Sequence, residues 1–365
     1  MIGALIGKLR RRQLLGAAAA LAAGRSPALA SPAAAAPLRR IGIGSCADQS
    51  RPAPIWRTIV ASRPDFFVFA GDNVYASTPP WSRAQLEAAY VQLGRDADFA
   101  KLRDGVPHLA VWDDHDYGVN DGGAEFAHKA ESKAAFLRFW RVPRDDPRQQ
   151  REGIYTAQIH GPVGQRVQFI VLDLRWFRSP WTPSARRGTP GQERYRPDDA
   201  PGLSLLGETQ WRWLEEQLRQ PAELRLIVSS IQILAEGHGY ERWGNFPRER
   251  QRLYELIAAT GAESVVLLSG DRHIGAFYRE TQGLPYALTE MTSSGLTHAW
   301  ADAKEPGPNR LGDLVTVNHF GLIDIDWPQR RLHLALLDEQ GRTRQQQSLS
   351  LDALRSQTGE RRQRD

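Results

Sequence analysis

The sequence predicts an α/β fold, and two observations support this class. Residues 66–70 form an apolar run without the alternation of a half-exposed strand, so the predicted strand is buried on both faces, as in a parallel sheet. Comparable runs recur at 167–172 and 265–268, and segments with apolar residues at helical spacing separate these strands. The 365 residues, 41% hydrophobic and 24% charged, are enough for one large globular domain or two smaller ones.

The remaining elements follow from the same two periodicities. Helices are expected where apolar residues share one face, as Leu86, Tyr90 and Leu93 do. The expected helices are 52–62, 82–93, 125–140, 206–218 and 249–259, and the expected strands are 40–48, 66–70, 107–112, 153–160, 166–174, 224–230, 264–269, 286–291, 321–325 and 332–337. Residues 177–203 are rich in Pro, Arg and Gly, and we expect them to form a long loop near the mouth of a site.

The first 37 residues carry the features of a leader. Arg10, Arg11 and Arg12 precede an apolar run that ends at Ala23, and residues 28–30 offer small side chains at a cleavage site. We interpret residues 1–37 as a twin-arginine signal peptide with a spacer, the alternative being an uncleaved amphipathic leader. The run is shorter than the roughly 18 residues that a membrane span needs. The expectation is a protein without a membrane span that passes the twin-arginine translocon and is periplasmic or secreted.

Charge and cysteine content narrow the range of partners. Lys and Arg number 47 against 42 Asp and Glu, but residues 1–30 hold five of the basic residues and no acidic one, so the remaining chain is balanced. The basic pI is therefore no argument for nucleic-acid binding.

Residues 38–350 are expected to form the folded domain, and 351–365 a charged, frayed tail. The single cysteine, Cys46, is a packing residue, a free thiol or a metal ligand.

Polar side chains gather at the ends of four predicted strands. In an α/β sheet the carboxyl ends of the strands border the ligand site. Packed carboxylates repel one another unless a cation or solvent takes up the charge. Mixed thiolate, phenolate, carboxylate and imidazole donors suit two or more metal ions, whereas a helix cap or a solvated acidic loop would explain any one group alone. The groups are Cys46 and Asp48; Asp72 and Tyr75; Asp114, His115 and Asp116; and Asp271 and His273.

The fourth group follows the predicted strand 264–269. Asp271 and His273 are two positions apart, so in an extended chain both point to the same side, and Arg272 points away. This spacing predicts two ligands of one metal cluster.

Taken together and in order, the four groups resemble the motifs of the calcineurin-like metallophosphoesterase superfamily, and within it the PhoD-like alkaline phosphatase D family. The matching blocks are Cys46-Ala47-Asp48, Gly71-Asp72-Asn73-Val74-Tyr75, Asp113-Asp114-His115-Asp116 and Gly270-Asp271-Arg272-His273. The resemblance covers nearly all of the chain after the leader. It implies a four-layer α/β/β/α sandwich of two mixed β-sheets flanked by helices, with a multinuclear metal centre at the strand ends. It also implies hydrolysis of phosphate esters, often at alkaline pH.

The resemblance further implies a set of ligands. Cys46, Tyr75 and His273 would hold Fe3+, and Asp114 and Asp271 would hold Ca2+, with Mn2+ or Zn2+ as alternative metals. Asp72 would bridge the ions. Asp48 stands where the superfamily has a histidine, and the separate histidine block of the superfamily has no clear match. The end of the strand at Ser229 to Gln232 is the nearest place for it.

As a mechanism we hypothesise that a metal-bound hydroxide attacks phosphorus in line. Arg175 would neutralise charge on the phosphoryl oxygens, or alternatively pair with Asp173 and brace the loop. His115 would protonate the leaving group or hold the phosphate, and Asp116 would orient His115.

The predicted function is hydrolysis of small-molecule phosphate mono- or diesters by an exported metal-dependent phosphoesterase. A hydrolase specific for phosphodiesters or phospholipids is one alternative. A non-catalytic phosphate or metal receptor, or an envelope protein that only binds Ca2+, is another. Release of nitrophenol from p-nitrophenyl esters would separate catalysis from binding alone.

Overall fold

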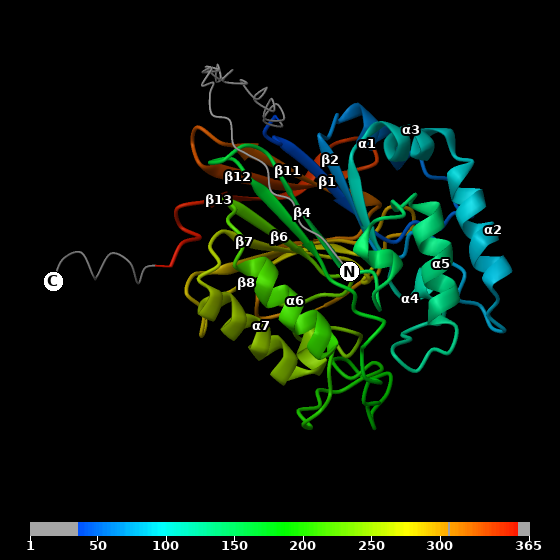
Figure 1. The fold of residues 1–365 in the computed structure, drawn as a ribbon. Coiled ribbons are helices and arrows are strands. Elements are labelled where there is room, and N and C mark those ends of the chain that lie inside the picture. The colour runs from blue at the N-terminus through cyan, green and yellow to red at the C-terminus, as the bar shows by residue number, and fades with distance from the viewer. Residues whose placement is uncertain (1–35, 306, 357–365) are drawn as a thin grey trace, which may run out of the picture. The chain divides into compact units, whose positions relative to one another are not determined.

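The buried strand predicted at 66–70 is β2 (Phe66–Ala70), and it lies inside the first of two β-sheets (Figure 1). The computed structural model describes residues 36–305 and 307–356. The predicted leader therefore falls almost entirely outside the described residues, as do the last nine residues of the predicted tail. Both faces of β2 are covered, because every one of its residues is buried. The alternating side chains face a helical layer on one side and the second sheet on the other.

The first sheet has the strand order β13-β12-β11-β1-β2-β3. The strands β1, β2 and β3 are parallel, and β11 to β13 continue the sheet in antiparallel fashion. Parallel neighbours end at the same edge of a sheet, so the loops that follow β1, β2 and β3 meet there. The strands besides β2 are β1 (Arg40–Gly44), β3 (His108–Val111), β11 (His319–Asp326), β12 (Arg331–Asp338) and β13 (Thr343–Ser350).

The second sheet has the order β10-β8-β9-β7-β6-β5-β4, with a parallel centre formed by β5, β6, β7 and β9. The strands β4, β8 and β10 pair in antiparallel fashion. The bounds are β4 (Thr156–His160), β5 (Val167–Val171), β6 (Leu224–Val228), β7 (Val265–Ser269), β8 (Gly275–Glu280), β9 (Leu288–Ser293) and β10 (Arg310–Val315).

The two sheets pack face to face through apolar side chains. Phe66 of β2 stacks on Phe169 of β5 with ring centroids 4.3 Å apart, an arrangement that aromatic pairs favour. At the edge where the loops meet, Ser45 and Ser294 form an isolated β-bridge between the ends of β1 and β9. Side chains that follow strands of different sheets therefore lie side by side at this edge.

Helices cover the outer faces of both sheets (Figure 1). Trp56 of α1 and Phe99 of α3 pack on Phe69 of the first sheet, and α6 and α7 lie along the second. The expected four-layer sandwich of two mixed sheets flanked by helices is thus confirmed. The helices are α1 (Ile55–Ala61), α2 (Arg83–Gly94), α3 (Ala97–Gly105), α4 (Asp114–Tyr117), α5 (Lys129–Phe139), α6 (Gly207–Leu218) and α7 (Pro247–Thr260), with 3-10 turns at Pro147–Gln149 and Trp243–Asn245.

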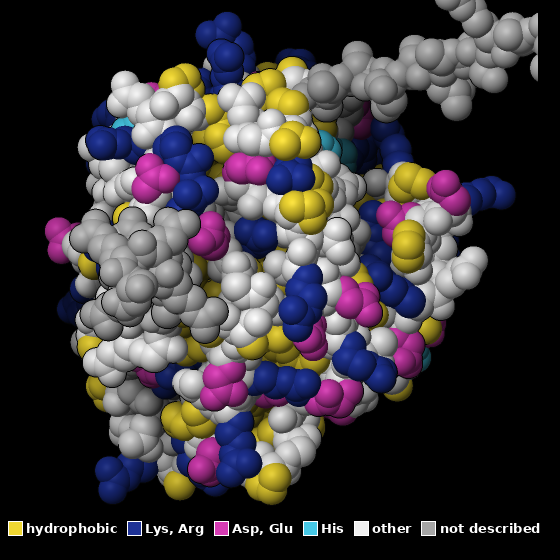
Figure 2. Space-filling model, turned by 60° about the vertical axis from the view of Figure 1, so that its left-hand side comes forward, with side chains coloured by type: hydrophobic (Ala, Val, Ile, Leu, Met, Phe, Trp, Pro, Cys, Tyr) yellow, Lys and Arg dark blue, Asp and Glu magenta, His cyan; other side chains and the backbone are white. Residues whose placement is uncertain are grey.

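The packed chain continues past residue 350, where the sequence suggested the tail begins. Leu351 and Leu354 are buried, and the carbonyl of Leu354 accepts a hydrogen bond from the Ser264 amide. Packing of the described chain therefore extends at least to Leu354. Within the described residues, no helix has the length and apolar character needed to span a bilayer. On the face drawn in Figure 2, basic and acidic side chains are interspersed rather than gathered by sign.

Candidate metal centre

The candidate ligands lie in tight turns directly after β1, β2 and β7. Cys46, Asp72, Asp271 and His273 all adopt left-handed backbone conformations, with φ of 62°, 49°, 71° and 54°. Such values are rare for residues with a side chain, and they persist where the surrounding structure enforces them, often at functional sites. The expectation that residues 271–273 are extended is therefore wrong. The turn directs Asp271 and His273 to different donor groups instead of to one side.

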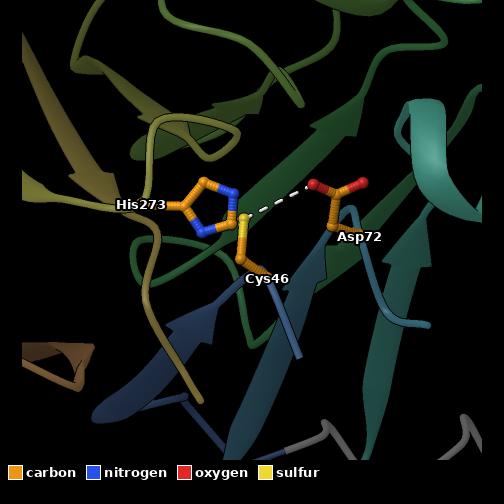
Figure 3. Close-up of side chains that lie close together, drawn as sticks. All are labelled: Cys46, Asp72 and His273. Atoms are coloured by element: carbon orange, nitrogen blue, oxygen red, sulfur yellow. Dashed lines mark hydrogen bonds between the residues drawn. The ribbon is translucent and has the colours of Figure 1, made fainter. Parts of the chain in front are cut away.

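The first donor group combines sulfur, carboxylate and imidazole. One ligand atom from each of Cys46, Asp72 and His273 lies within 4.8 Å of the others (Figure 3). The Cys46 thiol donates to Asp72 Oδ2 at 3.5 Å, and the Tyr75 hydroxyl donates to the same oxygen at 3.3 Å. The predicted quartet of thiol, phenol, carboxylate and imidazole is thus brought together.

The protein orients the imidazole of this group through its other nitrogen. His273 Nδ1 donates to the carbonyl of His298 at 3.1 Å, which leaves the lone pair of Nε2 free. Metal-binding histidines are usually oriented in this way by a partner on the second ring nitrogen. Burial lowers the pKa of His273 to about 4, so that the ring is neutral near pH 7. Ser294 completes the surroundings, with its Oγ 3.0 Å from the Cys46 sulfur.

The second donor group consists of carboxylates alone. One oxygen from each of Asp72, Asp113, Asp114 and Asp271 lies within 4.8 Å of the others, so Asp72 belongs to both groups. Asp113 Oδ2 and Asp114 Oδ1 are buried and have no hydrogen-bond partner among the described residues. Buried carboxylate oxygens without partners are costly, and a cation would satisfy them. Oxygen-rich groups suit hard cations, and the mixed group suits a softer or trivalent ion.

Several acidic side chains of the two donor groups have raised pKa values, which indicates that the site favours positive charge. Burial, followed by the charge of Asp114, raises the pKa of Asp72 well above its usual range. Burial likewise raises the pKa of Asp113 to about 8 and that of the Cys46 thiol to about 11, and it raises the pKa of Tyr75 strongly. Without cations the side chains of Asp72, Asp113, Cys46 and Tyr75 would therefore hold protons near pH 7. The residues fit metal ions, because ions would replace those protons and relieve the repulsion.

Arg175 does not face the site, and the expectation that it binds phosphate is not supported. Its side chain is fully buried, and Nε donates to Asp113 Oδ1 at 2.7 Å while Nη1 and Nη2 donate to the two oxygens of Glu241 at 2.8 Å. The alternative side-chain pair with Asp173 is absent too, because Asp173 accepts from backbone amides, including that of Arg175, and from Trp112. Arg175 instead holds two carboxylates in place, Asp113 of the second donor group and Glu241 at the pocket.

His115 lies at the pocket, but Asp116 does not orient it as expected. The side chain of Asp116 accepts from Asn73 Nδ2 and from the Asp113 amide, both at 2.6 Å, and so holds the turn after β3. The hydrogen-bond contact to the His115 ring comes from Ser77, whose Oγ lies 2.6 Å from Nδ1, and the Tyr75 ring packs against it with centroids 4.2 Å apart. Ser77 follows Asp72 by only five positions, yet nothing in the sequence indicated this contact.

Four members of the donor groups line a pocket of about 200 Å³, namely Asp72, Asp114, Asp271 and His273. Sequence reasoning missed much of its wall, which is formed by Asn120, Asp121, Arg194, Tyr240, Glu241, Arg272 and Trp300. The only signal was the loop 177–203, which was expected near the mouth and does supply Arg194. A further acidic group of Asp114, Asp121 and Glu241 is already engaged, because Arg194 pairs with Asp121 at 2.6 Å and Arg175 pairs with Glu241.

Asp48 and the strand end at 229–232, the two places compared above with histidine positions of the superfamily, lie outside both donor groups. Asp48 accepts from the amide and hydroxyl of Ser50 and pairs with Arg51 at 3.0 Å. At the other position, Ser230 donates to Asp113 Oδ1 at 2.5 Å, and Gln232 contacts His238. The strand end at 229–232 therefore supports Asp113 and supplies no histidine ligand.

Two facing mixed sheets with donor groups at their strand ends place the chain in the class of α/β sandwich metallophosphoesterases. A solved structure of PhoD matches 90% of this chain and 73% of its own chain with a TM-score of 0.68 at 16% identity. The purple acid phosphatase PPD1 from yellow lupin seeds matches 86% and 54% with a TM-score of 0.56 at 13% identity. More particularly, the chain belongs to the PhoD-like phosphatase family, a family of phosphoric ester hydrolases, whose model matches residues 41–333.

Curated relatives agree with this assignment. Alkaline phosphatase D of Bacillus subtilis (strain 168) is 24% identical over 209 residues, which are 50% of this chain and 34% of the relative. The probable inactive purple acid phosphatase 14 of Arabidopsis thaliana is 31% identical over 133 residues, which are 35% of this chain and 31% of the relative. The matches thus span about one third of either relative. The resemblance drawn from the four motif blocks is confirmed.

Proposed function

We propose that this chain is a metal-dependent phosphoesterase that hydrolyses small-molecule phosphate esters. The observation that supports this most directly is the sharing of Asp72 between a mixed donor group and an all-carboxylate group on the floor of one pocket. Asp72 with Cys46, Tyr75 and His273 would hold one ion, and Asp72 with Asp114 and Asp271 would hold the others. We propose Fe3+ for the first group and Ca2+ for the second, as the donor types favour.

Bound ions would lower the pKa of water and stabilise negative charge on the phosphoryl oxygens. The chain's own residues have separate tasks. His115 lies at the pocket, where it would hold a phosphoryl oxygen or protonate the leaving group, and Ser77 keeps its ring in place. Arg175 and Ser230 hold Asp113 through Oδ1, so its Oδ2 would be available to an ion bound by the carboxylate group.

The decisive experiment measures nitrophenol release from p-nitrophenyl phosphate and from bis-p-nitrophenyl phosphate. Activity should require added Ca2+ and should disappear with a chelator. Asp72→Asn should abolish turnover and lower the metal content, because it removes a donor from both groups. Asp48→Asn, a matched change outside both groups, should leave activity nearly unchanged. Metal binding without any ester hydrolysis would refute the proposal and favour a non-catalytic receptor.

The iron assignment has its own test. Thiolate and phenolate ligands on Fe3+ should colour the purified protein, and Cys46→Ser should weaken or shift that absorption. A colourless, iron-free and fully active enzyme would remove iron from the proposal and leave the phosphoesterase intact.

We also propose that the chain is exported through the twin-arginine route, on the basis of the leader features of residues 1–37. Replacing Arg11 and Arg12 together by lysine should retain the protein in the cytoplasm. Unchanged export of that variant would contradict the assignment.

A further inference from the structure

We propose that the rim of the pocket selects phosphate esters whose leaving group carries a planar aromatic ring, and that Trp300 is the surface on which this ring stacks. The inference rests on the proposed phosphoesterase function and adds the class of substrate to it. Four observations carry it: the size of the pocket, the exposure of Trp300, the fixed position of its backbone and the aromatic wall beside it.

The pocket is too small to enclose a whole substrate. Its volume of about 200 Å³ lies below the ~300–1,000 Å³ of pockets that enclose drug-sized ligands. Its floor is polar and acidic, so cations and the phosphoryl group would occupy it. The organic part of an ester must therefore extend across the rim, where it meets Trp300, Tyr240 and Arg194.

Trp300 is exposed where an indole would normally be covered. It is 40% exposed, and among the described residues it is the only aromatic member of the large hydrophobic side chains that remain open to solvent. A lone exposed apolar residue needs no explanation in general. Trp300 differs from the other four, Val91, Ile159, Val163 and Val317, because it alone lines the pocket.

The backbone that carries Trp300 is held in place. Its amide donates to the carbonyl of His273 at 2.7 Å, and the preceding amide of Ala299 donates to Asn318 Oδ1 at 2.9 Å. The backbone at Trp300 is therefore tied directly to a candidate metal ligand, His273. A stacking surface that is already in position costs less conformational entropy when a ligand binds.

Tyr240 forms an aromatic wall next to Trp300. The two rings meet edge to face, with centroids 6.2 Å apart and planes at 88°. Two guanidinium groups hold Tyr240, since Arg272 lies 4.1 Å and Arg194 5.7 Å from the centre of its ring. Arg272 is buried and paired with Glu305, so its position is fixed. The rim thus offers a corner of two aromatic rings, with guanidinium groups against one of them, and this corner is suited to a flat ring.

Matched pairs of esters test the inference. Adenosine 5′-monophosphate and ribose 5-phosphate share the same ester bond and differ by the base. Benzyl phosphate and cyclohexylmethyl phosphate differ in aromaticity and have similar leaving groups, so the two pairs separate a nucleobase from a simple aryl ring. We expect kcat/KM to favour the aromatic member of at least one pair. Trp300→Ala should reduce that preference about tenfold, in line with the ~1–3 kcal/mol that base stacking contributes.

A control variant tests whether the effect is specific to Trp300, and a binding measurement makes the test independent of turnover. Trp213→Ala removes an indole that packs on Tyr155 away from the pocket, and it should not change the preference. Phosphonate analogues of adenosine 5′-monophosphate and ribose 5-phosphate, in which CH2 replaces the ester oxygen, give dissociation constants by calorimetry with Ca2+ present. Their ratio should fall about tenfold in Trp300→Ala as well.

The possible outcomes distinguish the two proposals. Hydrolysis of all esters without aromatic preference, or a preference unaltered by Trp300→Ala, overturns the rim inference and leaves the proposed function standing. A Trp300-dependent preference in phosphonate binding without hydrolysis of any ester overturns the proposed function and retains the rim as a binding site. Failure of both phosphonates to bind overturns the rim inference.

Discussion

Replacing Arg175 by methionine should destabilise the protein strongly, because Arg175 pairs with the buried Glu241 carboxylate and hydrogen-bonds to the buried Asp113. Its guanidinium donates to Asp113 and to both oxygens of Glu241, and all three side chains are buried. Methionine fills similar volume but removes the hydrogen bond to Asp113 and the paired contact with Glu241, which keeps only the longer contact with Arg178 at 3.9 Å. Breaking a buried ion pair from one side typically costs about 3–5 kcal/mol. We therefore expect the free energy of unfolding of Arg175→Met to fall by about 4 kcal/mol.

Equilibrium urea unfolding of the metal-free protein, with chelator present, measures this change without a contribution from bound ions. The matched control is Arg219→Met, which breaks the exposed i,i+4 pair with Glu215, where the arginine side chain is 55% exposed. That change should cost less than about 1 kcal/mol. Arg175→Lys should not restore stability, since an ammonium cannot reproduce the paired contact with Glu241. A stable Arg175→Met variant with a greatly raised KM would refute the structural role and return Arg175 to phosphate binding.

Two further predictions concern histidines. Burial lowers the pKa of His319 to about 4, so the folded protein should lose up to about 2 kcal/mol between pH 7 and pH 5, as the unfolded chain binds a proton that the folded state excludes. In metal-free urea unfolding, His319→Gln should flatten this part of the pH profile, and an unchanged slope would contradict the assignment. Ser77→Ala should lower kcat/KM about fivefold by releasing the His115 ring, a loss typical of one hydrogen bond. The same substitution should have little effect in a His115→Ala background, and additive losses would exclude the coupling.

Most of the central strands could be predicted from the sequence, because burial on both faces leaves an uninterrupted apolar run. The runs at 66–70, 167–172 and 265–268 became β2, β5 and β7. Three strands were missed: β8 (Gly275–Glu280), β10 (Arg310–Val315) and β13 (Thr343–Ser350). The strands β10 and β13 lie at sheet edges and bury only one residue each, whereas β8 is largely buried. Helix α3 was missed as β10 and β13 were, since it buries only Phe99 and Leu102.

The candidate site was predictable only in part. Cys46, Asp72 and His273 stand in blocks with a recognisable spacing, and the fold brings them together. The rim depends on long-range packing, so Trp300 gave no signal in the sequence. For Arg175, the position in the sequence did not show in which direction the side chain points. The residue follows a strand that ends near the site, yet its side chain points into the protein and not toward the pocket.

The two sheets contribute to the first donor group jointly, since Cys46 and Asp72 follow strands of one sheet and His273 follows a strand of the other. A small slide between the sheets would separate the sulfur from the imidazole while every strand stayed intact. The affinity of the first donor group for a cation should therefore depend on how the two sheets are aligned. Substitutions at Phe66 or Phe169, far along the strands from any donor atom, should alter metal retention through that alignment alone.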